Sequence, residues 1–212
     1  MSLETRQAPA GSNAVLAAGF SDPVHDAQRC FRALMNAMAQ PGKRQTYDAS
    51  QLKPPVPLTP MGAALALTLF DYDTAIWLDP GLARSLDVLA FLRFHTSAPI
   101  VSTPVEASFA IVSDPAQMSA LSNFNQGSAD YPDRSTTVIL LNQTFSTDEH
   151  VELSGPGLKE PESFSSTPVP NGFWRQVQAN NAQYPRGVDL VFAGTDKIAA
   201  LPRSTRISPK GA

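Results

Sequence analysis

Four polar side chains share one side of a helix predicted near the start of the chain, and their types and spacing suggest chemistry. They recur at i, i+4, i+7 and i+11, which aligns them in one stripe: His25, Arg29, Arg32 and Asn36. Two interpretations stay open, a solvated face with local Asp–Arg pairs or a surface that meets an anion or a carboxylate-bearing partner. No neighbouring group in the sequence would make His25 a general base, so we assign it no catalytic role.

Three arginines follow near the end of the chain, beside predicted strands: Arg186, Arg203 and Arg206. The guanidinium fork matches two oxygens of a phosphate, so each is either a phosphate contact or one half of a surface ion pair. A Ser-Gly-Pro-Gly run at 154–157 is likewise either a tight turn or a backbone cradle for an anion. We take the six charged side chains of the two groups as candidate ligand or partner contacts.

No established catalytic or metal-binding motif is present. The sequence lacks the Gly-x-x-x-x-Gly-Lys-Ser/Thr loop, the Gly-x-Gly-x-x-Gly fingerprint and the Gly-x-Ser-x-Gly elbow. The histidines lie far apart, and the trio Asp148, Glu149 and His150 is interpreted as a solvated turn. Cys30 stands among apolar helix neighbours, which favours a core side chain over a nucleophile. We therefore expect no catalytic residue and no metal.

Composition bounds the class of protein. The chain has 212 residues, of which 42% are hydrophobic and 17% charged, and this suits one soluble domain. Its net charge of −3, without a basic run, argues against nucleic-acid or anionic-membrane partners. One cysteine allows no internal disulfide, which fits a cytoplasmic location. We see no signal peptide, and the longest apolar run, 61–70, is too short to span a bilayer.

The helix that must position the first stripe is predicted over 22–39. Ser21 or Asp22 can cap it, Pro23 suits its first turn, and Pro41 with Gly42 stops it. Apolar residues recur at three- and four-residue spacings along it, and we expect them to form its buried face: Val24, Ala27, Phe31, Leu34, Met35 and Met38.

Strands and helices intermix along the rest of the chain, which predicts an α/β domain with a mixed central sheet flanked by helices. Strands are predicted at 43–47, 74–78, 107–112, 135–141, 145–153, 163–169, 188–192 and 197–201, and the apolar run 135–141 is the clearest of them. Helices are predicted at 61–70, 82–94 with the alternative of a break near Asp87, 114–123, and 172–182 capped by Asn171. A proline-rich connector fills 51–60, and the chain from 202 on is expected to be extended and basic. We expect an arm at 1–18, one domain at 19–207 and a tail at 208–212.

Six segments in the same order resemble one protein family. They are Gly-Phe-Ser-Asp-Pro-Val-His-Asp-Ala-Gln-Arg-Cys-Phe-Arg at 19–32, the run 35–42, Leu-Arg-Phe-His-Thr at 92–96, Leu-Ser-Gly-Pro-Gly at 153–157, Tyr-Pro-Arg-Gly-Val-Asp-Leu at 184–190 and Ala-Leu-Pro-Arg-Ser-Thr-Arg at 200–206. Together they resemble the PhnH family, one component of the carbon–phosphorus lyase system, which degrades phosphonates.

The resemblance implies an accessory subunit of the lyase core complex, with subunits G, I and J as partners. In that system PhnH is needed together with subunits G and I to form alpha-D-ribose 1-methylphosphonate 5-triphosphate from ATP and methylphosphonate. Subunit I carries out this transfer, and subunit J later breaks the carbon–phosphorus bond. The resemblance also implies a homodimer and a fold like that of pyridoxal-phosphate-dependent transferases, without the cofactor. The alternative hypothesis is a phosphonate- or nucleotide-binding protein, or an enzyme, with its site in its own dimer interface.

The lysines bear on the cofactor separately from the resemblance. Schiff-base chemistry with pyridoxal phosphate needs a lysine in a sheltered pocket. The five lysines lie beside predicted turns, in the connector, in a hairpin and in the tail: Lys43, Lys53, Lys159, Lys197 and Lys210. We therefore predict that the protein binds no pyridoxal phosphate.

Overall fold

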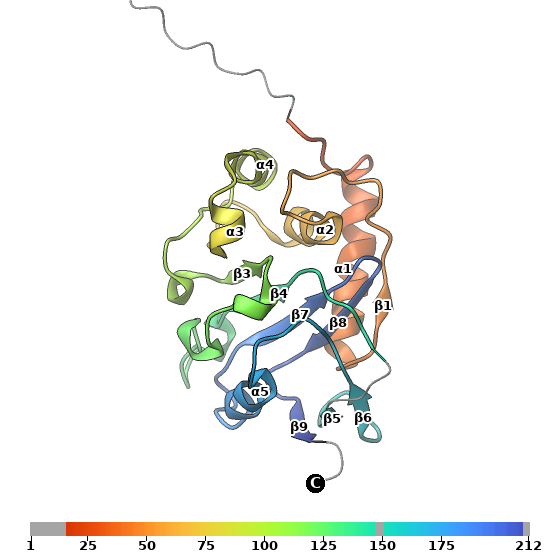
Figure 1. Ribbon diagram of the computed structural model, residues 1–212, viewed down its shortest axis with the longest axis vertical. Helices are drawn as coiled ribbons and strands as arrows, with labels where there is room; N and C mark the ends of the chain where they lie inside the picture. The colour runs from red at the N-terminus through yellow and green to blue at the C-terminus, as the bar shows by residue number, and fades with distance from the viewer. Residues whose placement is uncertain (1–15, 147–150, 210–212) are drawn as a thin grey trace, which may run out of the picture.

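A six-stranded mixed sheet runs through the centre of the computed structural model, which describes residues 16–146 and 151–209 (Figure 1). The strand order is β1-β8-β7-β4-β3-β2. Strands β2, β3, β4 and β7 are parallel, whereas β8 runs antiparallel to both β7 and β1. The bounds are β1 Gln45–Thr46, β2 Ile76–Leu78, β3 Phe109–Val112, β4 Thr137–Leu140, β7 Asp189–Ala193 and β8 Lys197–Leu201.

A second, three-stranded antiparallel sheet lies at one end of the molecule, in the order β6-β5-β9. Its strands are β5 (Val151–Ser154), β6 (Glu162–Phe164) and β9 (Arg206–Pro209). Strand β9 falls in the segment expected to be an extended basic tail; its backbone pairs with β5, and Ile207 packs into the core. Every predicted strand overlaps an observed one, although the observed strands are mostly shorter. The trio 148–150 lies outside the described residues.

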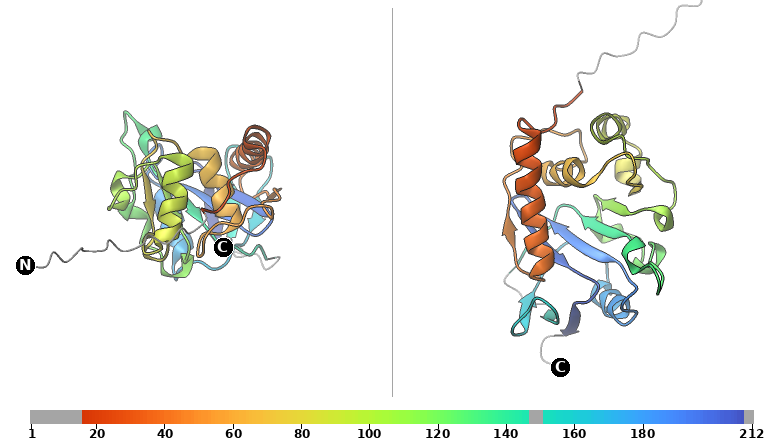
Figure 2. Two further views of the ribbon diagram at one scale, coloured as in Figure 1. Left: turned by 90° about the horizontal axis from the view of Figure 1, so that it is seen from above. Right: turned by 180° about the vertical axis from the view of Figure 1, so that it is seen from behind.

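Within the described residues, five α-helices cover the two faces of the central sheet. Helices α1 (Pro23–Ala39), α2 (Pro60–Leu69), α3 (Pro80–Ala83) and α4 (Leu86–Thr96) lie on one side, and α5 (Phe173–Asn181) lies on the other with the small sheet (Figures 1 and 2). The class predicted from the sequence, an α/β domain with a mixed sheet flanked by helices, is therefore confirmed. None of the helices in the described part of the chain has the length and apolar character needed to cross a membrane.

Local capping explains where four helices begin. The side chains of Asp22, Thr59, Asp79 and Ser85 accept hydrogen bonds from backbone N–H groups of the first turn, and proline follows three of them. Ser85 also divides the predicted helix 82–94 into α3 and α4, close to the break considered near Asp87. Helix α5 instead begins after Gly172 and has no side-chain cap, so the prediction of Asn171 as its cap is wrong.

The helix predicted at 114–123 is also wrong. Two 3₁₀ turns occupy this stretch, η2 (Pro115–Gln117) and η3 (Leu121–Asn123); further 3₁₀ turns are η1 (Pro104–Glu106) and η4 (Pro132–Arg134). The backbone N–H of Leu121 donates to Oε1 of Gln176 on α5 (2.9 Å) instead of to a carbonyl one helical turn earlier. A distant side chain thus replaces the helical hydrogen bond.

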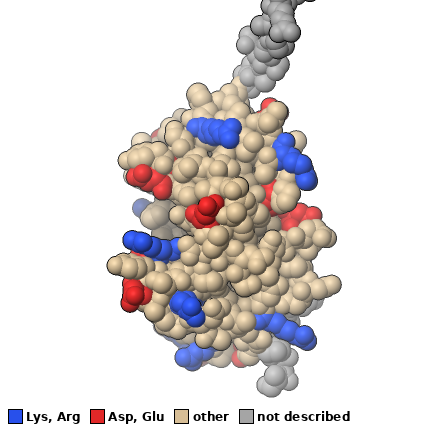
Figure 3. All heavy atoms as spheres, turned by 90° about the vertical axis from the view of Figure 1, so that its left-hand side faces the viewer, with Lys and Arg blue, Asp and Glu red and all other residues tan. Residues whose placement is uncertain are grey.

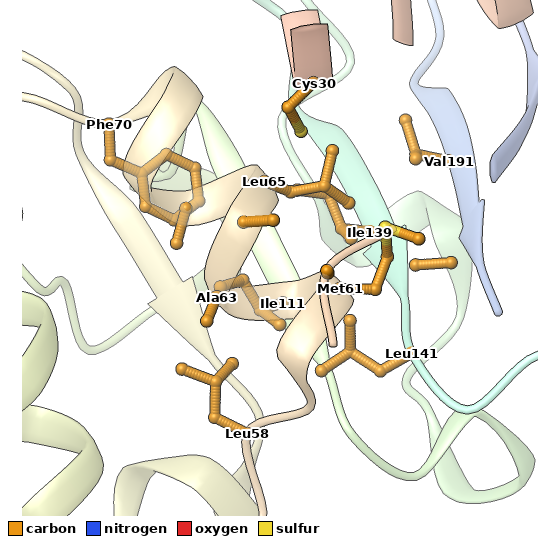
Figure 4. Close-up of a cluster of buried hydrophobic side chains, with 14 of the residues drawn as sticks. Cys30, Leu58, Met61, Ala63, Leu65, Phe70, Ile111, Ile139, Leu141 and Val191 are labelled. Carbon is orange, nitrogen blue, oxygen red and sulfur yellow. The ribbon is translucent and has the colours of Figure 1, made fainter. Parts of the chain in front are cut away.

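The core has one half on each face of the sheet. On the first, α2 is buried nearly all round and packs with α1 against the sheet around Leu65, Ile139 and Val191 (Figure 4). Cys30 is fully buried in this half, which confirms it as a core residue, and burial raises the pKa of its thiol to about 11. On the other face, aromatic rings join α5 and the small sheet to the central sheet, with the Phe164 and Phe192 ring centroids 5.2 Å apart.

Candidate functional site

Helix α1 buries a different face from the one predicted. Its buried residues are Cys30, Ala33, Leu34 and Ala37, whose small side chains let the helix lie close to α2 and β8. Three of the six residues expected in the core are instead solvent-exposed: Val24 (63%), Phe31 (49%) and Met35 (47%). The bulky side chains therefore form a separate apolar stripe beside the buried face. The prediction failed because it gave weight to large apolar residues, whereas the packing uses small ones.

The polar stripe of α1 lines a cavity of about 830 Å³. Three of its four members, Arg29, Arg32 and Asn36, face this cavity. The fourth, His25, does not line it: its Nδ1 lies 2.8 Å from Oδ2 of Asp22, the residue that caps the same helix. The structure thus brings together most of the stripe and separates the histidine from it.

The chain that follows α1 forms the opposite wall, from Gln45 to Leu52. Strand β1 reaches this position because it pairs with β8, with Gln45 opposite Ile198. Tyr47 then ties the wall to the helix: its hydroxyl donates to the backbone carbonyl of Asp26 (3.3 Å), and burial raises its pKa to about 12. Sequence reasoning missed Tyr47, although an aromatic residue at the end of a predicted strand was a usable signal.

A third wall comes from residues 18–21, ahead of α1. Helix α4 holds this segment, because Nε2 of His95 donates to the backbone carbonyl of Ala17 (2.9 Å). A Cβ added to Gly19 would lie 3.1 Å from the His95 ring, so the segments 19–32 and 92–96, which carry part of the resemblance, meet beside the cavity. His95 therefore positions the segment that leads into α1 and does not itself line the cavity.

Charges in the cavity nearly balance. Arg29 forms an ion pair with Asp26, while Arg32 has no ion pair or hydrogen bond with any described side chain or backbone group. Asp48 is exposed, and hydrogen bonds from Ser50 hold the pKa of its carboxyl below the usual value. Amide side chains of Asn36, Gln45 and Gln51 complete a lining suited to a polar ligand with both donors and acceptors. Among the residues that the structure describes, no cluster of His, Cys, Asp and Glu could hold a metal ion.

The three late arginines do not converge on this cavity. Arg203 is largely buried, and its guanidinium binds Asp189 (Nη2 to Oδ2, 2.5 Å) and the carbonyl of Pro132. Its backbone N–H donates to the same carboxylate (2.7 Å), so this arginine joins β7 to the turn after β8. Arg186 and Arg206 are exposed, and neither forms an ion pair within the described part of the chain.

Two glycine-containing segments have structural roles. The Ser-Gly-Pro-Gly run is a turn packed on the end of α1: Gly157 has φ +87°, and a Cβ there would lie 2.4 Å from the carbonyl oxygen of Ala39. In the segment 184–190, the side chain of Asn180 hydrogen-bonds both backbone groups of Val188 (2.8 and 2.9 Å). Neither segment contributes a side chain to the cavity.

The lysines are placed away from the cavity. Lys43, Lys53, Lys159 and Lys197 are exposed, and none of them lines it; Lys210 lies outside the described residues. A sheltered lysine of the kind that holds pyridoxal phosphate is therefore not found in the described chain. The absence of the cofactor stays a prediction.

Comparison with known proteins identifies the family. The sequence model of one protein family, described as bacterial phosphonate metabolism protein (PhnH), matches residues 18–208. The chain is 35% identical over 193 residues to alpha-D-ribose 1-methylphosphonate 5-triphosphate synthase subunit PhnH of Rhizobium meliloti (strain 1021), covering 91% of this chain and 96% of the relative. It is 32% identical over 190 residues to the putative C-P lyase subunit protein HtxG of Stutzerimonas stutzeri, covering 87% of each. The chain that folds around this cavity therefore belongs to the PhnH family of bacterial phosphonate metabolism proteins.

Proposed function

We propose that this protein is an accessory subunit of the carbon–phosphorus lyase core complex, with subunits G, I and J as its partners. It acts with G and I when ATP and methylphosphonate are joined into alpha-D-ribose 1-methylphosphonate 5-triphosphate. The observation that carries the proposal is the match to a relative named as a subunit of this synthase, which extends over 96% of that relative. Because the reaction consumes ATP, we place it in the cytoplasm.

Exposed apolar side chains support a role in assembly. Besides the stripe on α1, helix α4 exposes Leu86 (79%) and Phe94 (71%), two turns apart on one side of the helix. Apolar side chains gathered along exposed helix faces are typical of protein–protein contacts. The face on the left of Figure 1 carries only scattered charged side chains, which suits contact with protein rather than nucleic acid (Figure 3).

The stripe on α1 suits a homodimer. Its exposed members are Val24, Phe31 and Met35, and the partly buried Ala27 and Met38 extend it, so that apolar residues stand four and seven positions away on either side of Phe31. Two copies of such a helix can pack antiparallel around a twofold axis through Phe31, so that each apolar side chain meets an apolar one. We assign this surface to the homodimer and the α4 surface to another subunit.

The relation to pyridoxal-phosphate-dependent transferases is part of the same proposal and rests on the sequence resemblance. The exposed positions of four lysines support a member of that fold that works without the cofactor. The subunit then contributes shape and contacts rather than covalent chemistry.

The second candidate function is ligand binding in the cavity beside α1. Its volume, about 830 Å³, is that of a pocket for a nucleotide-sized molecule, and Arg29 and Arg32 could contact phosphate or phosphonate oxygens. Calorimetric titration with ATP, methylphosphonate and the ribosyl product tests it. Binding that Arg32→Ala weakens supports this function, and absence of heat with all three rejects it.

Co-purification tests the main proposal. The chain is expressed with tagged subunits G, I and J, and formation of the ribosyl product is followed by ³¹P NMR with and without it. We expect a stable complex and loss of product when the chain is omitted. The proposal is contradicted if the chain never associates with these subunits, or if the product forms equally well without it.

A further inference from the structure

A small hollow lies where the chain leaves α1 and passes strand β6. Its volume is about 300 Å³, and it is distinct from the cavity beside α1, with which it shares no lining residue. Lys43 and Arg44 line one part of it, and Glu162, Ser163 and Ser165 line another. Residues far apart in the sequence meet here because β1 and the small sheet both adjoin the end of α1 (Figure 1).

The two cations stand apart from the ion pairs of the described residues: none of those pairs includes Lys43 or Arg44. Arg44 is nevertheless fixed in place, because its Nη2 donates to the carbonyl of Ser146 (2.8 Å) and its Cζ lies 5.7 Å from the centroid of the Phe145 ring. Its remaining N–H groups have no hydrogen-bond acceptor among the described residues. A positioned guanidinium and a neighbouring ammonium group give the hollow a positive field.

A hydroxyl group supplies a second, independent indication of a ligand. Ser165 lines the hollow and is only 1% exposed, and its Oγ is buried without a hydrogen-bond partner among the residues that the structure describes. Buried polar groups are normally paired, so an unpaired one at the wall of a charged hollow indicates a missing acceptor. Ser163, two residues earlier on β6, offers another hydroxyl.

We propose that this hollow binds a tetrahedral oxyanion with at most a small substituent, the group shared by inorganic phosphate, alkylphosphonates and the terminal phosphate of a nucleotide. Its volume is at the lower end for ligand pockets, which suits one phosphate-sized group better than a whole nucleotide. Donors come from two separate chain segments, so they suit oxygens that point in several directions better than the two coplanar oxygens of a carboxylate. The proposal concerns the isolated protein and does not rest on the proposed function.

Glu162 gives the site a distinguishing property. This exposed carboxylate lines the same hollow and repels an anion, so it weakens binding. Removing its charge should therefore tighten binding, while removing either cation should weaken it. If these residues had a purely structural role, the substitutions would not change the affinity for the anion in opposite directions.

The experiment titrates the purified protein with inorganic phosphate, methylphosphonate, ATP and acetate by calorimetry, with ³¹P line broadening for the phosphorus compounds. We expect Lys43→Ala and Arg44→Ala each to weaken phosphate binding by about tenfold, the loss of one charge-assisted hydrogen bond. Ser165→Ala should weaken it by about threefold, and Glu162→Gln should tighten it by about threefold. Comparison of phosphate, methylphosphonate and ATP identifies which source of the group the site prefers.

Lys159→Ala is the matched control, because Lys159 is an exposed lysine outside the hollow. Its effect on phosphate binding should be less than twofold. Lack of phosphate binding, equal effects of Lys43→Ala and Lys159→Ala, acetate binding as tight as phosphate, or an unchanged affinity in Glu162→Gln would each overturn the proposal. Melting curves confirm folding of every variant. Co-purification of the same variants with the other subunits distinguishes a failure of the anion-site proposal from a failure of the proposal that the protein is a lyase subunit.

Discussion

Replacing Arg203 by alanine should destabilise the fold rather than remove a ligand contact. The Arg203 side chain is 15% exposed and the Asp189 side chain 13% exposed, so both charges are held largely away from water. Arg203→Ala leaves the Asp189 carboxylate without its cationic partner and also removes the donor to the Pro132 carbonyl. Loss of one partner of a buried ion pair costs about 3–5 kcal/mol, and the residual exposure of both groups favours the lower end, about 3 kcal/mol.

The assay is urea unfolding followed by tryptophan fluorescence and circular dichroism, with thermal melting as a second measure. A loss of about 3 kcal/mol should lower the melting temperature of a chain of this size by about 6–12 °C. Arg186→Ala is the control, since Arg186 is exposed and should change the free energy of unfolding by less than about 0.5 kcal/mol. Combining Arg203→Ala with Asp189→Asn should cost about 1–2 kcal/mol less than the sum of the single changes.

One result would refute this reasoning. If Arg203→Ala lost less than about 1 kcal/mol of stability and yet bound phosphate or ATP more weakly, the residue would be a ligand contact. The ion pair to Asp189 would then be incidental to the fold. Additive effects in the double variant would point the same way, because independent residues do not couple.

Four further predictions test other parts of the structure. Phe31→Asp should convert the proposed dimer to a monomer in light scattering, whereas Leu86→Asp on α4 should leave it a dimer; the reverse pattern would exchange the two surfaces. Gly157→Ala should lower the free energy of unfolding in urea by about 2–4 kcal/mol, because of the positive φ and the contact with Ala39, and a change below about 0.5 kcal/mol would disprove the need for glycine. Cys30 should resist thiol reagents at pH 8 until the protein unfolds, and rapid labelling of the native protein would contradict its burial. As pH rises from 9.0 towards about 11 the unfolded chain releases the thiol proton that the folded chain keeps, so Cys30→Ala should reduce the loss of stability in that range.

Local signals were sufficient for much of the fold. The start of α1 was predicted to within one residue from the capping residue Asp22 and the proline that follows it. The Pro41-Gly42 stop likewise marked its end. The helix predicted at 61–70 likewise begins within one residue of α2, where Thr59 is the cap and Pro60 the first helical residue. These signals act over a few residues, so neighbours in the sequence suffice to predict them.

Features that depend on distant parts of the chain were not predictable in this way. The helix expected at 114–123 fails because Gln176 captures the N–H of Leu121. The cavity was invisible in the sequence because its far wall is brought beside α1 by the pairing of β1 with β8. Arg203 gave no sign of its burial, since its partner Asp189 is specified only by the β7–β8 hairpin.

The order of the strands has a consequence for synthesis on the ribosome. Helix α1 and β1 are made well before β8, yet both dock on β8. Strand β7, which lies between β4 and β8, is likewise made after β4. Contacts between such distant residues slow folding and delay it until β8 has left the ribosome. Until then the pairing that places β1 beside α1 is missing, so the cavity forms only after β8 has been made.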